Sequence, residues 1–170
     1  MYKIMHKVDS SILLIIYNSL ILPYLMYCIE IWGNTYSSRL RELILLQKRA
    51  IRIIDKAGFR DHTSGIFKRL KLLKFVDLSY YQTCVLMYNA NKGTLPTKVQ
   101  VNFKRNCDVH KYNTRLKDNF YTRQTTTQIS KMSVNLKGVE IWNNLPKTTK
   151  SSVSINVFKR RIRKAMLERY

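Results

Sequence analysis

The sequence predicts a mainly α-helical fold: a helical bundle around a central apolar helix, with a small β element and a basic C-terminal helix. Three observations lead to this prediction. Apolar residues recur at helical spacing over several long segments, only one short segment alternates strictly between apolar and polar residues, and lysine and arginine crowd the last segment. A chain of 170 residues is long enough to bury a core without disulfides or metals.

The first helix is expected over residues 11–32, and its apolar character raises the question of a membrane. Asp9 and Ser10 can cap its start, and Pro23 predicts a kink. A membrane-spanning helix needs about 20 mainly apolar residues, whereas this segment contains a proline and the charged Glu30. It is therefore a marginal membrane span, and we favour a helix buried in a core. A single-pass membrane protein with a basic cytoplasmic tail is the alternative.

A second helix is expected over residues 38–56, with two distinct faces. The apolar face, expected to pack on the core, contains Leu40, Leu43, Ile44, Ala50, Ile51 and Ile54. A separate sector of about 100° forms a cationic ridge about 22 Å long, comparable to six base pairs of duplex. This ridge contains Arg41, Lys48, Arg49, Arg52 and Lys56. It predicts contact with one phosphate backbone, and an ordinary solvated helix face is the alternative.

Two further helices complete the first half of the chain. Residues 62–74 are expected to form a short helix, whose basic residues are Lys68, Arg69, Lys71 and Lys74. Residues 77–92 follow as a longer helix, and its apolar stripe is Leu78, Tyr81, Val85 and Tyr88. We expect residues 1–93 to form one helical bundle on which residues 94–170 pack.

The second half is less regular. Residues 94–128 show no sustained period and predict an extended, basic connection. Residues 131–137 alternate, which predicts a short strand with Met132, Val134 and Leu136 on its buried side. A helical turn then ends at Pro146. The closing helix, within residues 154–170, presents Phe158, Ile162, Ala165 and Met166 on one face, and its basic side includes Lys159, Arg160 and Arg163.

The charge of the chain points to a polyanionic partner. It contains 31 Lys and Arg against 10 Asp and Glu, which gives a net charge of +21. Such self-repulsion favours nucleic acid as the partner, with anionic lipid or a bare basic surface as alternatives. Residues 1–33 have no net charge, so the basic surface begins after the first helix.

The sequence lacks the residue patterns of common catalytic sites. It contains no GxxxxGK[ST], GxGxxG, HExxH or GxSxG motif, and no adjacent pair of aspartates that could hold two Mg²⁺ ions. Cys28, Cys84 and Cys107 are widely spaced, which argues against a disulfide framework and a zinc site. We expect no catalysis, cofactor, metal ion or small-molecule substrate, and an intracellular, nuclear or cytoplasmic location.

Seven stretches, taken together in their order, resemble the C-terminal region of non-LTR (LINE-type, Jockey-like) retrotransposon reverse transcriptases. They are SLILPYLMYCIEIWG, LQKRAIRII, DHTSGIFKRLKLLKF, LP, HKYNTR, GVEIWNNLP and FKRRIRKAMLERY, and they span nearly the whole chain. The resemblance implies a thumb-like bundle and the segment after it. It also implies that the first apolar helix is the buried central helix, because the matching stretch in the family belongs to a soluble polymerase. The Asp-Asp motif of this family lies upstream, so the resemblance implies a non-catalytic fragment of an RNA-directed DNA polymerase.

The resemblance also implies a ligand and a set of contacts. A polymerase thumb holds the template-primer through its phosphates, so RNA or DNA, above all an RNA–DNA hybrid, is the expected partner, together with an upstream fingers-palm core. Gln47 and Tyr36 are weaker candidates for contacts to 2′-hydroxyl groups. Beside the cationic ridge, the further candidates for contacts to the nucleic acid are Lys68, Arg69, Arg115, Lys159, Arg160 and Arg163. For the matched segment around His110, Tyr112, Asn113 and Arg115 as a whole, we favour a structural role, with His110 and Asn113 satisfying backbone groups, over an RNA contact. Trp142 is expected to anchor the C-terminal segment in the core.

Overall fold

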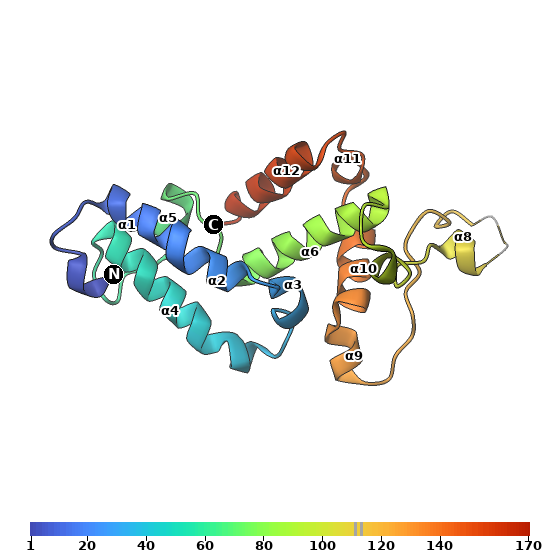
Figure 1. Cartoon of the computed structure of the whole chain (residues 1–170), viewed down its shortest axis with the longest axis horizontal. Helices are drawn as coiled ribbons and strands as arrows, with labels where there is room; N and C mark the ends of the chain where they lie inside the picture. The colour runs from blue at the N-terminus through green and yellow to red at the C-terminus, as the bar shows by residue number, and fades with distance from the viewer. Residues whose placement is uncertain (111, 113) are drawn as a thin grey trace.

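The computed structural model describes residues 1–110, 112 and 114–170, and within them the fold is mainly helical, as predicted. Its elements are η1 (Tyr2–Ile4), α1 (Ser10–Ile16), the π-helical turn η2 (Tyr17–Ile21), α2 (Leu22–Met26), α3 (Ile29–Trp32), α4 (Ser37–Asp55), α5 (Ser64–Arg69), α6 (Phe75–Lys92), α7 (Thr97–Gln100), α8 (Asn106–Val109), α9 (Gln128–Met132), α10 (Val134–Asn144), α11 (Lys147–Lys150) and α12 (Ile155–Leu167). The molecule is elongated, with α8 at one end and the N-terminal segment at the other (Figure 1).

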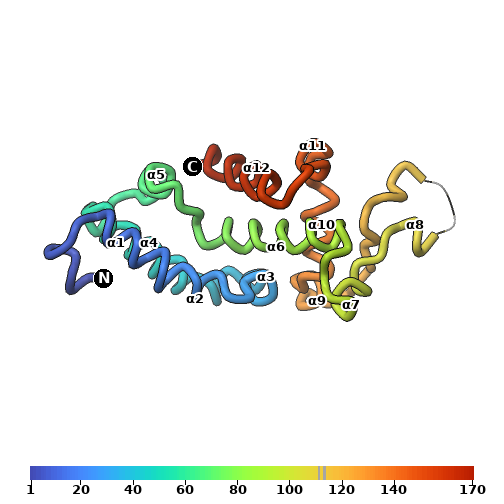
Figure 2. The backbone as a smooth tube through the Cα atoms, turned by 45° about the horizontal axis from the view of Figure 1, so that its top comes forward, coloured from blue at the N-terminus to red at the C-terminus, as the bar shows by residue number. Residues whose placement is uncertain are grey.

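The centre of the molecule is α6. Figures 1 and 2 show it running along the long axis, with α12 on one side, α2 and α3 on the other, and α10 across its C-terminal half. Its buried residues point in several directions around the helix, from Phe75 and Leu78 to Cys84, Met87 and Tyr88. A helix that is apolar on several sides is expected at the centre of a core.

The prediction that residues 11–32 form the buried central helix is wrong. Ile15 is 65% exposed, Tyr24 82% and Ile31 66%, so this segment lies on the surface and buries only one side. Its inner residues Leu13 and Tyr17 are fully buried against α4 and α5. The sequence is apolar nearly all round, but only the inner side has neighbours.

The kink expected at Pro23 takes the form of a π-helical turn just before it. The backbone N–H of Leu22 bonds the carbonyl of Tyr17, five residues back. The wider turn accommodates the proline ring, which would clash with the carbonyl four residues earlier in a regular helix. The helical path breaks later, at Cys28, whose φ of 49° is left-handed. In the part of the chain that the structure describes, no helix is both long enough and apolar enough to cross a membrane.

The helix α4 packs largely as predicted. Leu40, Ala50, Ile51 and Ile54 are buried, whereas Leu43 and Ile44 are half-buried at the edge of the same face. Gln47 is also buried, at 2% exposure. This contradicts its candidacy for a nucleic-acid contact, because the side chain is enclosed between helices.

The strand predicted over residues 131–137 is wrong, because this segment belongs to α9 and α10. Ser133 alone has extended backbone angles and begins α10. The buried residues of α10 and its C-terminal cap are spaced as in a helix: Gly138, Val139, Ile141, Trp142 and Leu145. This longer helical period prevails over the short alternation. Within the described residues, extended pairing is limited to one isolated bridge between Arg105 and Phe120.

The segment 94–128 carries the short helices α7 and α8 in an otherwise irregular path. Phe103 and Phe120 anchor it, since both are buried and their rings meet edge to face at 6.1 Å. Trp142 contacts Phe120 and Phe158 and is 3% exposed, which confirms its predicted role as an anchor. The larger core therefore contains residues from both sides of residue 93.

Candidate nucleic-acid interface

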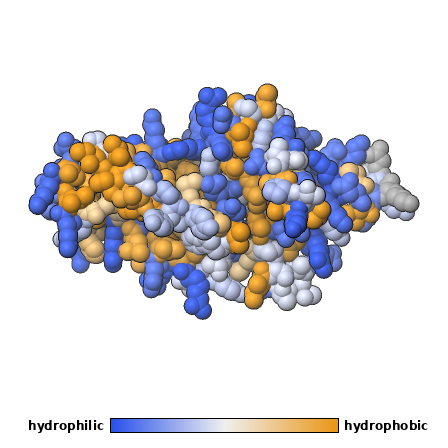
Figure 3. Space-filling model, viewed as in Figure 1, coloured by the Kyte–Doolittle hydropathy of each residue, from blue (hydrophilic) through white to orange (hydrophobic). Residues whose placement is uncertain are grey.

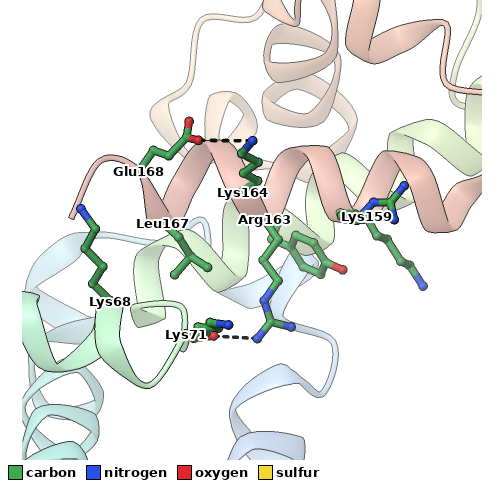
Figure 4. A pocket seen from close by; sticks show the side chains of 9 residues that line it. Lys68, Lys71, Lys159, Arg163, Lys164, Leu167 and Glu168 are labelled. Atoms are coloured by element: carbon green, nitrogen blue, oxygen red, sulfur yellow. Dashed lines mark hydrogen bonds and ion pairs between the residues drawn. The ribbon is translucent and has the colours of Figure 1, made fainter.

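A basic groove lies between α12 and the segment around α5 (Figure 4). Its volume is about 540 Å³. It is lined by Lys68, Lys71, Tyr81, Lys159, Arg160, Arg163, Lys164, Leu167 and Glu168. Six of these nine side chains are cationic and one is acidic, so the groove concentrates positive charge within a small volume. Hereafter "the groove" means this cavity.

The sequence positions α12 through one buried stripe. Phe158, Ile162 and Met166 recur every four residues and are all at most 5% exposed, so this side faces the core. The side-chain oxygen of Ser154 accepts a hydrogen bond from the backbone N–H of Val157, at 3.3 Å, and caps the start of the helix. Ala165, which the sequence placed on the packed face, is exposed.

The C-terminal end of α12 is fastened to the start of α6. The hydroxyl of Tyr170 donates a hydrogen bond to the Asp77 carboxylate and accepts one from the backbone N–H of Lys74, at 2.8 Å. The Lys74 ammonium lies 4.1 Å from the centre of the Tyr170 ring, a cation–π distance. Burial, followed by the bond to Asp77, raises the pKa of Tyr170, so this contact persists through neutral pH.

Arg163 connects the two walls of the groove. Its Nη2 donates a hydrogen bond to the carbonyl of Lys71 at 2.7 Å, drawn as a dashed line in Figure 4. Lys71 has a left-handed φ of 53°. The bond uses one of the five N–H groups of the guanidinium, so the others stay available to a ligand. Glu168 lies 3.9 Å from Lys164, a long contact between exposed side chains that is worth little.

We call the apolar part of the groove lining, Leu167 and Tyr81, its floor. Leu167 extends from α12 between Lys68 and Arg163 (Figure 4). Tyr81 of α6 lines the same cavity and is half-buried. Burial raises the pKa of Tyr81 despite the opposing charge of Arg163, so its phenol is neutral at pH 7. The groove thus combines a cationic rim with a floor that contains an aromatic and an aliphatic side chain.

The cations of the α4 ridge do not converge on one cavity. Lys48 lines a cavity of about 220 Å³ together with Lys74 and Val76. Arg49 and Arg52 line another cavity, of about 420 Å³, beside Tyr2 and Phe59. The Arg52 Nε also donates to the backbone carbonyl of Asp61, at 2.9 Å.

Arg41 and Lys56 are exposed, and Lys56 ends α4 with a left-handed φ of 55°. Among the described residues, no acidic side chain forms an ion pair with any of the five ridge cations.

The other predicted site residues divide between the groove and separate places. The groove brings together Lys68, Lys159, Arg160 and Arg163. Arg69 instead forms an ion pair with Asp55 of α4. Arg115 lies in a different cavity, with Tyr121 and Asn143.

The matched segment around His110 is described only in part. His110 makes an edge contact with the Tyr121 ring, with centroids 5.8 Å apart. Asn113, named above with it, lies outside the described residues.

Sequence reasoning missed three groove residues as binding candidates: Lys71, Lys164 and Tyr81. The signal for Lys164 was present, since Arg160, Arg163, Lys164 and Leu167 are spaced as one helical face. Tyr81 was read only as part of a packing stripe. Its position beside α12 is a tertiary contact that the helical period of α6 does not encode.

Comparisons with protein-family models, curated proteins and solved structures give no match. In the described part of the chain, no three His, Cys, Asp or Glu side chains cluster as metal ligands would.

Proposed function

We propose that this chain is a non-catalytic nucleic-acid-binding module that holds a phosphate backbone in the groove. The observation that carries this proposal is that six Lys and Arg side chains from two distant segments, α12 and the α5 region, line one groove together with a single carboxylate. Cations brought this close repel one another, and a polyanion relieves that repulsion while it releases its own counterions.

The chemistry of the groove suits phosphate rather than a base sequence. Lysine and arginine donate hydrogen bonds and do not accept them, and phosphate oxygens only accept. Arginine also matches phosphate geometry with two parallel N–H groups. Arg163, held by the Lys71 carbonyl, is oriented before any ligand arrives. Contacts of this kind position a nucleic acid without selecting its sequence.

The resemblance to non-LTR reverse transcriptases makes the ligand an RNA template paired with a DNA primer. In this proposal the module acts as a thumb, and a fingers-palm core supplies the catalytic aspartates. The exposed apolar residues of the N-terminal segment, such as Ile15, Tyr24 and Ile31, support a protein partner on that surface. They lie in residues 1–33, which carry no net charge, so nucleic acid and partner would use different regions.

The proposal is tested by titrating a fluorescent RNA–DNA template-primer with purified protein at several salt concentrations. If the groove cations neutralise six phosphates, the logarithm of affinity should fall against the logarithm of salt with a slope of about −4 for single strand to about −5.5 for duplex. A flat salt dependence, or no binding at low salt, would contradict the proposal.

A variant identifies the groove as the surface responsible. Replacing Lys68, Lys159 and Arg160 with glutamine should weaken binding and make the slope shallower by about 2 to 3, because each lost phosphate contact removes about one counterion. The matched control replaces three exposed lysines of the segment 94–128, Lys98, Lys104 and Lys117, with glutamine. Equal losses in both variants would mean that net charge alone drives binding.

A further inference from the structure

The floor of the groove indicates which form of nucleic acid it takes. A surface that binds only phosphates needs cations and water, and an apolar floor adds nothing to its affinity for them. Here Tyr81 and Leu167 line the same cavity as the six cations. We infer that the groove binds a single strand, with one base against Tyr81 and its flanking phosphates on the rim. This inference rests on the proposed function and adds to it the unpaired part of the template-primer as the ligand.

The size of the groove agrees with this ligand. Its volume of about 540 Å³ lies in the range of small-ligand pockets, about 300–1,000 Å³. A cavity of this size can take in one or two nucleotides of an extended strand. A duplex keeps its bases stacked and paired, so it presents mainly its backbone and groove edges. The apolar floor would then remain uncovered.

The chemistry of Tyr81 suits a base rather than a phosphate. Aromatic side chains bind bases of any sequence, because every base has a π-face. Tyr81 is half-buried, so its ring is held by the core while part of it faces the cavity. Its phenol remains uncharged at neutral pH, since burial raises its pKa, and so it does not repel a polyanion.

The placement of the cations matches a single strand as well. Lys159, Arg160, Arg163 and Lys164 come from α12 on one wall, and Lys68 and Lys71 come from the other (Figure 4). Arg163 spans the two walls through the Lys71 carbonyl, at 2.7 Å. Phosphates on both sides of a bound base would therefore meet positive charge. A guanidinium fixed next to the floor also offers N–H groups to a phosphate or to the acceptor atoms of a base edge.

The experiment combines changes in the protein with changes in the ligand. Anisotropy titrations compare a single-stranded oligonucleotide, the same strand with abasic units, and a blunt duplex of equal length. The protein is the full chain, either unaltered or with Tyr81→Leu or Tyr81→Phe. Leucine keeps an apolar floor without a ring, and phenylalanine keeps the ring without the hydroxyl. Circular dichroism and thermal melting establish that both variants are folded.

We expect Tyr81→Leu to weaken single-strand binding about 5- to 150-fold, the range measured for base–aromatic stacking. Binding of the blunt duplex and the salt slope should stay unchanged, and Tyr81→Phe should bind like the unaltered chain. Abasic strands should bind the unaltered chain about as weakly as base-containing strands bind the leucine variant. The leucine variant should not distinguish the two strands.

Two results would overturn the inference, and they differ from a failure of the proposed function. Equal affinity of the unaltered chain for abasic and base-containing strands would show that the floor takes no base, even if the leucine variant failed to fold. Equal weakening of duplex and single strand by Tyr81→Leu would assign Tyr81 a structural role. In both cases nucleic-acid binding itself survives. If no nucleic acid binds at low salt, the proposed function fails and this inference fails with it.

Discussion

At the scale of single residues, Gln47 lies three residues after Ile44 and four before Ile51, so helical spacing places this polar side chain on the apolar face of α4. Gln47 is polar, yet it is buried and satisfies three groups at once. Its Nε2 donates to the Tyr17 hydroxyl and to the Leu73 carbonyl, both at 3.0 Å, and its Oε1 accepts from the Phe75 N–H at 2.8 Å. It thereby connects α4 to the N-terminal segment and to the start of α6.

Replacing Gln47 with leucine should lower the free energy of unfolding by about 2–4 kcal/mol, since it leaves the Leu73 carbonyl and Phe75 N–H buried without partners. Urea unfolding followed by circular dichroism measures the change. Gln124→Leu is the control, because Gln124 is exposed and surface changes usually stay within about 0.5 kcal/mol. Similar losses in the two variants would refute the bridging role.

The buried thiol of Cys84 should make the free energy of unfolding depend on pH in the alkaline range. Burial raises the pKa of its thiol from 9.0 to about 12. Between these values the unfolded chain loses the thiol proton while the folded chain keeps it, so stability falls as pH rises above about 9. The slope reaches about 1.4 kcal/mol per pH unit for one proton.

Urea unfolding at several pH values between about 8 and 11 measures this slope. Cys84→Ala should make the slope shallower by up to about one proton, whereas replacing the exposed Cys107 should not. An unchanged slope in Cys84→Ala would contradict the assignment.

At the scale of elements, the sequence predicted the long helices well and their surroundings poorly. The sequence predicts α4 and α12 because each buries a stripe that recurs every three or four residues. It also predicts the region of α6, although α6 is buried on several sides and Tyr81 and Val85 of its predicted stripe are only half-buried. The strand over 131–137 was wrong because seven residues are too few to separate an alternation from the first turns of α10. Burial was misjudged for residues 11–32, since an apolar sequence does not reveal how many neighbours surround it.

The close approach of the end of α3 to α6 at Gly33 leads to a prediction about stability. Gly33 follows α3 where it meets α6, and a Cβ there would lie 2.5 Å from the Ile29 carbonyl oxygen and 2.6 Å from the Ser79 Oγ. Gly33→Ala should therefore lower the melting temperature, because the backbone must shift. Gly65→Ala in α5 is the control, since its Cβ would meet nothing within 4 Å. That control should stabilise the helix by about 0.5–1 kcal/mol. Equal effects of the two changes would refute the close contact.

At the scale of the whole molecule, the sequence predicts how much charge and apolar surface the protein has. It does not predict where on the surface either one gathers. The net charge of +21 is a property of the composition, and it led to the expectation of a polyanion. The groove depends on how α12 packs beside α6 and α5, which no local period contains. The groove gathers cations from different elements, whereas the ridge on α4 has cations on one helix face that line different cavities. Figure 3 likewise shows apolar residues gathered over the N-terminal end of the molecule.

The same net charge predicts how the stability of the fold responds to ions. Raising sodium chloride from about 20 to about 300 mM shortens the Debye length from about 20 to about 6 Å, which screens repulsion between the cations. The melting temperature should rise by about 2–4 °C for each 1 kcal/mol of repulsion relieved. Differential scanning calorimetry measures it.

A short polyphosphate at equal ionic strength should raise the melting temperature further, because it binds the folded groove and not the dispersed cations of the unfolded chain. Lys68, Lys159 and Arg160 replaced together by glutamine should lose this extra increase but keep most of the salt effect. If polyphosphate and chloride stabilise the protein equally at the same ionic strength, its cations act only as diffuse charge. The convergence of α5 and α12 would then carry no binding site.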